Sequence, residues 1–468
     1  MTALTMTAQD KTTGASSLRA QRGSRGRMIG GVAALCLLLA GCTGNKDVIL
    51  SGQRLDPRTG EPVGQVGLEA ASAQENTTRK INMGKQVSRS AWTHVGAGPG
   101  HDAGHNAFTS GTPTLAWATP IGTGDNRKYR LSTTPVAANG LVVTLDAKAT
   151  LTAVSASAGT PVWSVDLTPL GERAGDANGG TLAIDNGTVY ATTGYGELVA
   201  LDLTSGGVKW RQKIDAAGAS GVTVFEGVVY VTGADGRAWA VETDDGRVRW
   251  QLSGTESVTS RIGAATPALT SKYAIFPFAS GDLVAAFRKG GVRAWSASLA
   301  GSRKGVVYAE TSDITADPVI KGDTFYVGNQ AGRFGAFAVE GGARIWTASE
   351  GAYSPASVVG GSVFIVTDRN ELVRLDASNG ERIWGQQLPL YTTDKPRKRK
   401  GVYAHYGPIA AGGRLWVASS DGALRGFAPE SGQLVTQIAL PAPAASDPIV
   451  VGGVMYLLLA TGELAALR

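Results

Sequence analysis

The segment ALDLTSGGVKW, residues 200–210, decides the fold of this chain because its pattern recurs along the sequence. It consists of a short apolar stretch, a polar turn that ends in glycine, and a tryptophan four residues after that turn glycine. Small polar residues before glycine favour a tight turn with a positive φ angle, so the segment predicts a β-hairpin. The tryptophan then lies on the second strand of that hairpin.

Six copies of this pattern end in tryptophan, and a seventh, GFAPESGQLVT, has Thr436 in its place. Successive copies lie 47, 40, 45, 51, 38 and 52 residues apart. A repeat of about 45 residues with four short strands is typical of a β-propeller blade. We expect each tryptophan on the outermost strand of its blade, packed between neighbouring blades. The six tryptophans are Trp163, Trp210, Trp250, Trp295, Trp346 and Trp384.

The two ends of the repeat region set the number of blades. Trp117 lies one repeat length before Trp163, but no strands of a blade precede it. The C-terminal segment 447–468 supplies three strands and stops where a tryptophan strand should begin. Pairing residues 115–121 with this segment closes the ring and removes its open sheet edges. We therefore expect residues 91–468 to form an all-β, eight-bladed propeller of four-stranded antiparallel blades.

The first 41 residues have the features of an export signal. Four arginines precede an apolar run, residues 28–39, which is too short to span a bilayer. The sequence LAGC, which ends at Cys42, resembles the lipobox at which lipoprotein signal peptides are cleaved. We expect acylated Cys42 to anchor the protein. By resemblance to proteobacterial lipoproteins, Thr43 in place of an aspartate favours sorting to the outer membrane, where the anchor would lie on the periplasmic side. An ordinary signal peptide with an incidental cysteine is the alternative.

Residues 42–90 lack apolar periodicity, and we expect them to form a flexible tether between the lipid and the propeller. Cys36 lies within the signal, so the mature chain keeps Cys42 as its only cysteine and has no disulfide or thiol nucleophile. The signal carries a net charge of +4 out of the formal +6 of the chain. The nearly neutral body therefore argues against nucleic-acid binding.

The body shows no pattern that indicates catalysis. His94, His101 and His105 fall in a glycine-containing lead-in, residues 91–111, without the ligand spacing of a zinc site. A GxSxG nucleophile motif is absent from the sequence, and the carboxylates at turn positions are explained by the repeat. We predict a protein that is not an enzyme and that has no metal or cofactor.

Several phrases of the sequence together carry a resemblance to a known family. They are the lipobox, GHN in the lead-in, TTGYGELVALDLTSGGVKW (192–210), TSDITADPVI (311–320), TDRNELVRLDASNGERIW (367–384) and YGPIAAGGRLWVASSDGAL (406–424). From about residue 90 to its end, the chain thus resembles the BamB family, the lipoproteins of the outer-membrane β-barrel assembly machinery, in its alphaproteobacterial form. The resemblance implies a scaffold that docks on the POTRA domains of the barrel-forming subunit BamA and meets other assembly lipoproteins indirectly. We add the hypothesis that a blade edge holds an unfolded client strand.

The resemblance also implies which residues contact the partner. In the loop after the third blade, SVTSRIGAATP (257–267), Arg261 and Ile262 match a family segment, although the spacing to the following proline differs by one residue. In the loop after the fourth blade, Asp313 matches the first of two family aspartates, and Thr315 replaces the second. Both loops join an outer strand to the next inner strand, so we expect them on one face.

A third connection of this type, residues 389–408, carries five cations between positions 395 and 400. This cluster could meet anionic lipid, lipopolysaccharide or an acidic partner, or it could be a solvated charged loop. The tryptophan repeats also resemble those of pyrroloquinoline-quinone dehydrogenases, which share the eight-bladed scaffold. A quinone-dependent periplasmic dehydrogenase is thus the enzymatic alternative, although the vicinal cysteines and calcium motif of those enzymes are not found. A generic ligand-binding envelope propeller is the third possibility.

Overall fold

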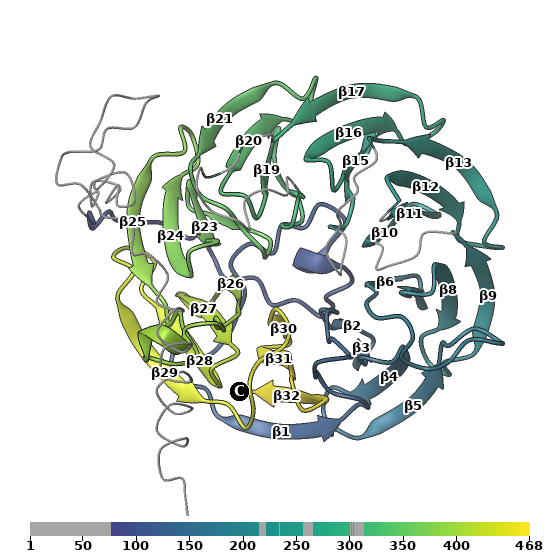
Figure 1. The fold of residues 1–468 in the computed structure, drawn as a ribbon, viewed down its shortest axis with the longest axis horizontal. Helices are drawn as coiled ribbons and strands as arrows, with labels where there is room; N and C mark the ends of the chain where they lie inside the picture. Colours follow the sequence, from purple (N-terminus) through teal and green to yellow (C-terminus); the bar gives the residue numbers. More distant parts are fainter. Residues whose placement is uncertain are drawn as a thin grey trace, which may run out of the picture. The chain divides into compact units, whose positions relative to one another are not determined.

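A computed structural model describes residues 76–214, 221–233, 235–255, 265–299, 301, 303 and 313–468. The described residues form eight antiparallel sheets of four strands each, arranged as a ring (Figure 1). In every sheet the strands follow one another outward from the centre of the ring. The predicted eight-bladed, all-β propeller is therefore confirmed. None of the helices within the described ranges is long and apolar enough to span a membrane.

The first four blades each consist of four strands that are consecutive in the chain. Blade 1 contains β2 (Val136–Ala138), β3 (Leu141–Leu145), β4 (Thr150–Ser155) and β5 (Pro161–Asp166). Blade 2 contains β6 (Leu182–Asp185), β7 (Thr188–Thr192), β8 (Glu197–Asp202) and β9 (Val208–Lys213). Blade 3 contains β10 (Gly221–Phe225), β11 (Val228–Thr232), β12 (Arg237–Glu242) and β13 (Val248–Ser253). Blade 4 contains β14 (Ala268–Leu269), β15 (Tyr273–Pro277), β16 (Asp282–Phe287) and β17 (Arg293–Ser298).

Blades 5 to 7 repeat this order, and blade 8 combines both ends of the propeller. Blade 5 contains β18 (Val319–Lys321), β19 (Thr324–Gly328), β20 (Phe334–Ala338) and β21 (Arg344–Ala348). Blade 6 contains β22 (Ser357–Val359), β23 (Ser362–Val366), β24 (Glu371–Asp376) and β25 (Arg382–Gln387). Blade 7 contains β26 (His405–Ala411), β27 (Arg414–Ser419), β28 (Ala423–Phe427) and β29 (Leu434–Ala439). Blade 8 contains β30 (Ile449–Val451), β31 (Val454–Leu459), β32 (Glu463–Leu467) and β1 (Leu115–Pro120).

Blade 8 closes the ring as the sequence predicts. Strand β1 pairs antiparallel with β32, so that Trp117 lies opposite Ala466. Beyond the strands, the backbone N–H groups of Thr114 and Arg468 each donate to the other residue's carbonyl, at 2.8 and 2.9 Å. The N-terminal strand therefore covers the outer edge of the C-terminal sheet.

Each predicted repeat tryptophan lies on the outer strand of its blade and contacts the next blade. Its ring packs against the turn glycine between the third and fourth strands of that neighbour. A Cβ atom built on that glycine would come within 2.4 to 2.8 Å of the ring in every case, and the glycine φ angles are positive. Only glycine fits such a position, because it needs a left-handed backbone and no side chain. The seven pairs are Trp117–Gly159, Trp163–Gly206, Trp210–Gly246, Trp250–Gly291, Trp295–Gly342, Trp346–Gly380 and Trp384–Gly432.

The same geometry explains why the seventh copy of the repeat ends in Thr436 instead of tryptophan. The neighbour of blade 7 is blade 8, whose third and fourth strands, β32 and β1, come from opposite ends of the propeller. No turn connects these two strands, so no turn glycine is present to receive an indole ring. The hydroxyl of Thr436 instead accepts a hydrogen bond of 3.1 Å from Arg414.

The segment before β1 crosses the ring and contacts all eight blades. It includes the short helix η2 (Val95–Ala97), which lies near the centre of the ring in Figure 1. One contact to each blade, in order from blade 1 to blade 8, is Trp92–Ala137, Thr93–Ile184, His94–Val224, Pro99–Leu269, Gly100–Ile320, Arg79–Asp376, Asn106–Ala410 and Arg89–Gly452.

The boundary that we expected between tether and propeller, at residue 90, differs from the structure. Asn76 already exchanges two hydrogen bonds of 2.9 Å with the backbone of Gly385 on β25. Ile81 and Met83 pack on the apolar core shared by blades 6 and 7. These apolar side chains do not follow a strand or helix period, so the sequence pattern gave no sign that they are buried. Residues 76–90 therefore belong to the propeller.

Candidate partner-docking face

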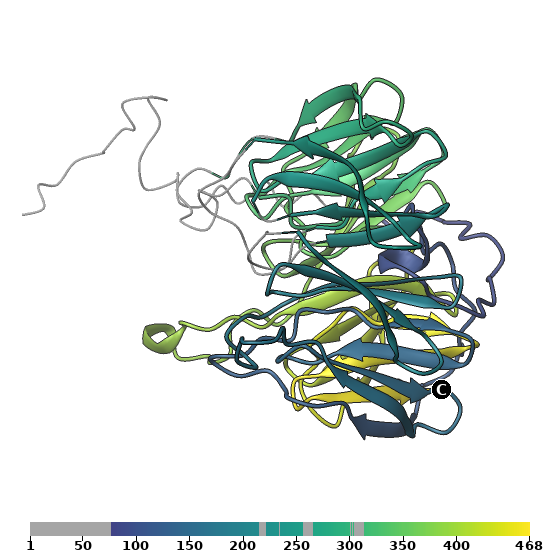
Figure 2. The ribbon, with the colours of Figure 1, turned by 90° about the vertical axis from the view of Figure 1, so that its right-hand side faces the viewer.

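A central channel opens on the face where the outer strand of each blade connects to the inner strand of the next. Its volume is about 970 Å³. Among the residues that the structure describes, seven connections between blades contribute to its lining, and Val95 of η2 lines it as well. The lead-in lies on the opposite side of the ring from the projecting connection between blades 6 and 7, which carries the short helix η4 (Pro396–Lys398) (Figure 2). We call the end of the channel on the side of η4 its mouth (Figure 2).

The structure describes two of the four predicted contact residues. Arg261 and Ile262 fall outside the described residues. Asp313 and Thr315 are described, and their exposed fractions are only 8% and 6%. The hydroxyl of Thr315 donates a hydrogen bond of 2.6 Å to the carbonyl of Ala352, and Thr315 also lines the channel. Thr315 therefore belongs to the channel wall, Asp313 is a buried residue of the same connection, and the role of all four residues in partner contact remains a prediction.

Arg303 connects the loop between blades 4 and 5 to blade 6. Its guanidinium group binds both carboxylate oxygens of Asp368, at 2.8 and 3.0 Å, and contacts Glu350 at 3.2 Å. The Arg303 backbone N–H also donates to the carbonyl of Ala331 in blade 5, at 2.8 Å. Charge-assisted bonds in this two-pronged geometry fix orientation as well as position. Arg303 therefore holds its loop on two successive blades.

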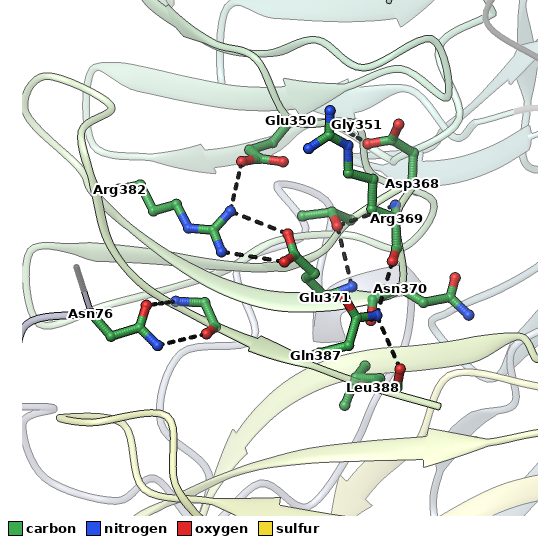
Figure 3. A network of polar contacts seen from close by, with 12 residues as sticks. Asn76, Glu350, Gly351, Asp368, Arg369, Asn370, Glu371, Arg382, Gln387 and Leu388 are labelled. Atoms are coloured by element: carbon green, nitrogen blue, oxygen red, sulfur yellow. Dashed lines mark hydrogen bonds and ion pairs between the residues drawn. The ribbon is translucent and has the colours of Figure 1, made fainter. Parts of the chain in front are cut away.

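The network continues across blade 6 (Figure 3). Arg382 on β25 binds Glu350 at 3.2 Å and Glu371 at 3.1 Å. Asp368 also accepts a hydrogen bond of 2.8 Å from the backbone N–H of Gly351. Burial raises the pKa of Glu350, while Arg382 and Arg303 oppose this rise. The two arginines therefore compensate three acidic side chains that are largely withdrawn from water.

Blade 6 also supports the connection that leads to blade 7. Asn370 donates hydrogen bonds to the carbonyl groups of Tyr403 at 2.8 Å and Pro389 at 3.3 Å. Gln387 at the end of β25 donates to the carbonyl groups of Asn370 and Leu388, at 2.9 and 3.0 Å. Polar contacts thus connect Arg303 of the loop after blade 4, through blade 6, to the loop after blade 6 on this side of the channel face.

The lead-in histidines serve as buried cross-links. The Nε2 atom of His94 lies 2.9 Å from the carbonyl oxygen of Val224 in blade 3. The Nδ1 atom of His101 lies 2.8 Å from the carbonyl oxygen of Pro318, and its Nε2 lies 3.3 Å from the hydroxyl of Thr266. Burial lowers the pKa of His94 to about 3 and also lowers the pKa of His101. Both rings are therefore neutral at physiological pH and act as hydrogen-bonding groups.

Sequence reasoning missed the Arg303 network and the function of the histidines. The phrase 367–384 contains Asp368, Glu371 and Arg382, but nothing in its pattern pairs them with an arginine 65 residues away from Asp368. The sequence feature that could have indicated the role of the histidines is their position in a glycine-rich segment outside the repeats.

Comparison with known proteins supports the family resemblance. The family model for the outer membrane protein assembly factor BamB, which describes quinoprotein-like repeats, matches residues 147–386. A BamB of Salmonella typhimurium is 28% identical over 363 residues, which cover 76% of this chain and 89% of that protein. The crystal structure of BamB from Moraxella catarrhalis has a TM-score of 0.62 at 15% identity and covers 76% of this chain and 99% of its own.

The ring is also similar to that of an enzyme. The quinohemoprotein alcohol dehydrogenase from Comamonas testosteroni superposes with a TM-score of 0.59 at 14% identity, covering 81% of this chain and 80% of the enzyme. At this level of identity the two solved structures share the fold with this chain, and a shared fold does not carry a shared activity.

Proposed function

Because this chain belongs to the family of the outer membrane protein assembly factor BamB, we propose that it is a non-catalytic scaffold of the machinery that assembles outer-membrane β-barrels. In this proposal Cys42 carries the lipid anchor on the periplasmic side of the outer membrane. The POTRA domains of a BamA-like barrel-forming subunit dock on the connections between blades. Other assembly lipoproteins are reached through that subunit, and an unfolded client strand is a further possible ligand.

The observation that carries this proposal is the polar linkage of loops on the channel face. The Arg303–Asp368 pair and the Asn370 contacts attach two different connections, those after blades 4 and 6, to one blade. A docking surface gains affinity when its groups are held in place before binding, because less conformational entropy is then lost. The tryptophan–glycine contacts join neighbouring blades at their outer strands, so the blades that carry these loops are themselves fixed to one another.

The test is a mild-detergent pull-down of the tagged protein from its native envelope. Wild type should retain the barrel-forming subunit, and Arg261→Glu and Asp313→Arg should lose it. Asp313 is buried, so Asp313→Asn and a thermal melting curve of each variant separate lost docking from lost folding. Arg247→Glu is the matched control, because Arg247 precedes β13 and lies at the other end of that strand from the predicted loop.

Each result of the pull-down has a distinct meaning. Retention of the subunit by well-folded Arg261→Glu and Asp313→Arg variants would reject the contact residues but keep the scaffold function. Absence of the subunit from the wild-type preparation would reject the scaffold function itself.

The channel residues do not fit the metal–quinone group of the dehydrogenase alternative. Within the described ranges, no three His, Cys, Asp or Glu side chains gather closely enough to hold a metal ion. The channel carboxylates are already bonded to the protein: Asp317 accepts two bonds of 2.6 Å from Thr266, and Asp447 accepts bonds from Ser354 and Gly407 at 2.8 and 2.6 Å.

A further inference from the structure

The connection between blades 6 and 7 folds into a hairpin that projects from the ring, defined here as the basic hairpin, residues 389–404 (Figure 2). Its two arms meet in a bridge between Tyr391 and Val402. The Thr392 N–H donates to the Gly401 carbonyl at 3.0 Å, and the Tyr403 N–H donates to the Leu390 carbonyl at 2.9 Å. The hairpin therefore has a defined backbone structure.

The tip of the basic hairpin concentrates positive charge. It carries five cations and one acidic residue, Asp394, so its net charge is +4. All five cationic side chains are exposed, and none of them forms an ion pair with any residue that the structure describes. The guanidinium group of Arg399 lies 4.9 Å from the centre of the Tyr391 ring. The five cations are Lys395, Arg397, Lys398, Arg399 and Lys400.

The base of the basic hairpin is attached to the rest of the docking face. Asn370 of blade 6 binds both of its arms, through the carbonyl groups of Pro389 and Tyr403. The Nε2 atom of His405 lies 2.8 Å from the Pro389 carbonyl oxygen, and its Nδ1 lies 2.7 Å from the hydroxyl of Ser419. These contacts hold the base of the hairpin at the mouth of the channel, and the charged tip projects from there (Figure 2).

Apolar side chains lie at the base of the basic hairpin and not at its tip. Tyr391 and Val402 are 38% and 59% exposed, and Tyr353 from the preceding connection is 36% exposed. All three line the channel. A loop that enters a membrane carries its apolar groups where it meets the acyl chains. In this hairpin the described side chains from 394 to 400 are all charged, and the apolar surface at the base lines a pocket.

From this arrangement we propose that the basic hairpin and the channel mouth together bind an acidic polypeptide segment. The cations of the tip pair with its carboxylates, while Tyr391, Val402 and Tyr353 contact its apolar side chains. Opposite charges speed the association of the two molecules, but exposed ion pairs contribute little binding free energy. The apolar contacts at the mouth bury surface and so contribute further affinity. This inference uses residues other than the four predicted contact residues Arg261, Ile262, Asp313 and Thr315.

The experiment measures fluorescence anisotropy with the purified mature chain and a labelled peptide of four Glu-Glu-Leu repeats. Binding should weaken as salt is raised, since salt screens exposed charges. The combined variant Lys395→Glu, Lys398→Glu and Lys400→Glu should bind at least about tenfold more weakly. The variant Tyr391→Ser with Val402→Ser should also bind more weakly while keeping its salt dependence.

One control reverses three positive charges in other blades, and a second control replaces the acidic peptide by a basic one. Lys209→Glu, Lys213→Glu and Arg247→Glu, combined, alter three cations of blades 2 and 3 and should leave binding unchanged. A Lys-Lys-Leu peptide should not bind. Equal affinity of the hairpin variant and wild type would overturn the proposal, as would hairpin-dependent binding to phosphatidylglycerol vesicles without binding of the acidic peptide. No barrel-assembly partner is present, so this result is independent of the pull-down.

Discussion

The ring of Trp346 leaves no room for a side chain on Gly380 of the next blade: a Cβ atom on that glycine would lie 2.5 Å from Cε3 of the indole. The indole N–H of Trp346 donates to the carbonyl of Ala377 in the same neighbouring blade, at 3.0 Å. The contact therefore joins blades 5 and 6 both by close packing and by a hydrogen bond.

Replacement of this glycine tests the contact directly. Gly380→Ala should destabilise the propeller by about 2–5 kcal/mol, because backbone strain at positive φ adds to overpacking against Trp346. Gly361→Ala in the same blade is the matched control: its φ is +70°, close to the +76° of Gly380, but open space surrounds its Cβ position. Chemical denaturation should show the larger loss for Gly380→Ala, and equal losses would mean that strain alone matters.

Exchanging the outer-strand residues of blades 6 and 7 tests the explanation of the missing tryptophan. Trp384 is fully buried and donates to the Pro429 carbonyl at 3.1 Å, so Trp384→Thr should cost about 3–5 kcal/mol. Thr436→Trp should not stabilise the chain, since blade 8 has no turn glycine to receive the indole ring. A rise in melting temperature for Thr436→Trp would contradict this account.

The fold was predictable because its determining signals are local and repeated. A glycine turn followed by tryptophan recurs at blade spacing, and the unpaired Trp117 strand indicated how the ring closes. The signals for the docking face are neither local nor repeated. Arg303 and Asp368 lie on either side of blade 5 in the sequence, and no pattern in either segment indicates that they form a pair. His94 contacts a backbone carbonyl group, which a residue of any type could supply. The sequence therefore predicted the architecture but not the polar linkage of its loops.

The Arg303–Asp368 pair should be a major contributor to stability. Asp368 has no exposed side-chain surface, so Arg303→Met removes the guanidinium group that pairs with a buried carboxylate and should cost about 3–5 kcal/mol. Arg303→Met combined with Asp368→Leu should cost less than the sum of the single changes. Arg247→Met is the matched control, because Arg247 is 77% exposed and its pair with Asp245 spans 3.7 Å. That surface pair should contribute less than about 1 kcal/mol.

The double-variant comparison also decides whether the ion pair positions the docking loop. If the double variant is well folded yet fails to retain the barrel-forming subunit, the pair acts through the position of the loop. Strictly additive single changes, measured by denaturation, would show instead that the two side chains are not energetically coupled.

Acid should weaken the propeller through the lead-in histidines. The pKa of His94 falls from 6.5 to about 3 on folding, chiefly because of burial and also because of His101 nearby, and Asp317 faces His101. Between these two pKa values the unfolded chain binds the proton and the folded chain does not. The stabilisation is therefore complete above about pH 6.5 and is lost as the pH falls towards 3, at about 1.4 kcal/mol per pH unit for His94.

The variant His94→Gln isolates this effect from the lost contacts. At pH 7.5 the ring is neutral in both states, so the difference between variant and wild type reports the hydrogen bonds to Val224 and Thr93 alone. At pH 5 the wild type should have lost about 2 kcal/mol more stability than the variant, because the variant has no proton to bind at this position. Denaturation curves at the two pH values measure both quantities. If wild type and variant lose the same free energy between pH 7.5 and pH 5, His94 does not contribute to the acid sensitivity, and His101 or the carboxylates must account for it.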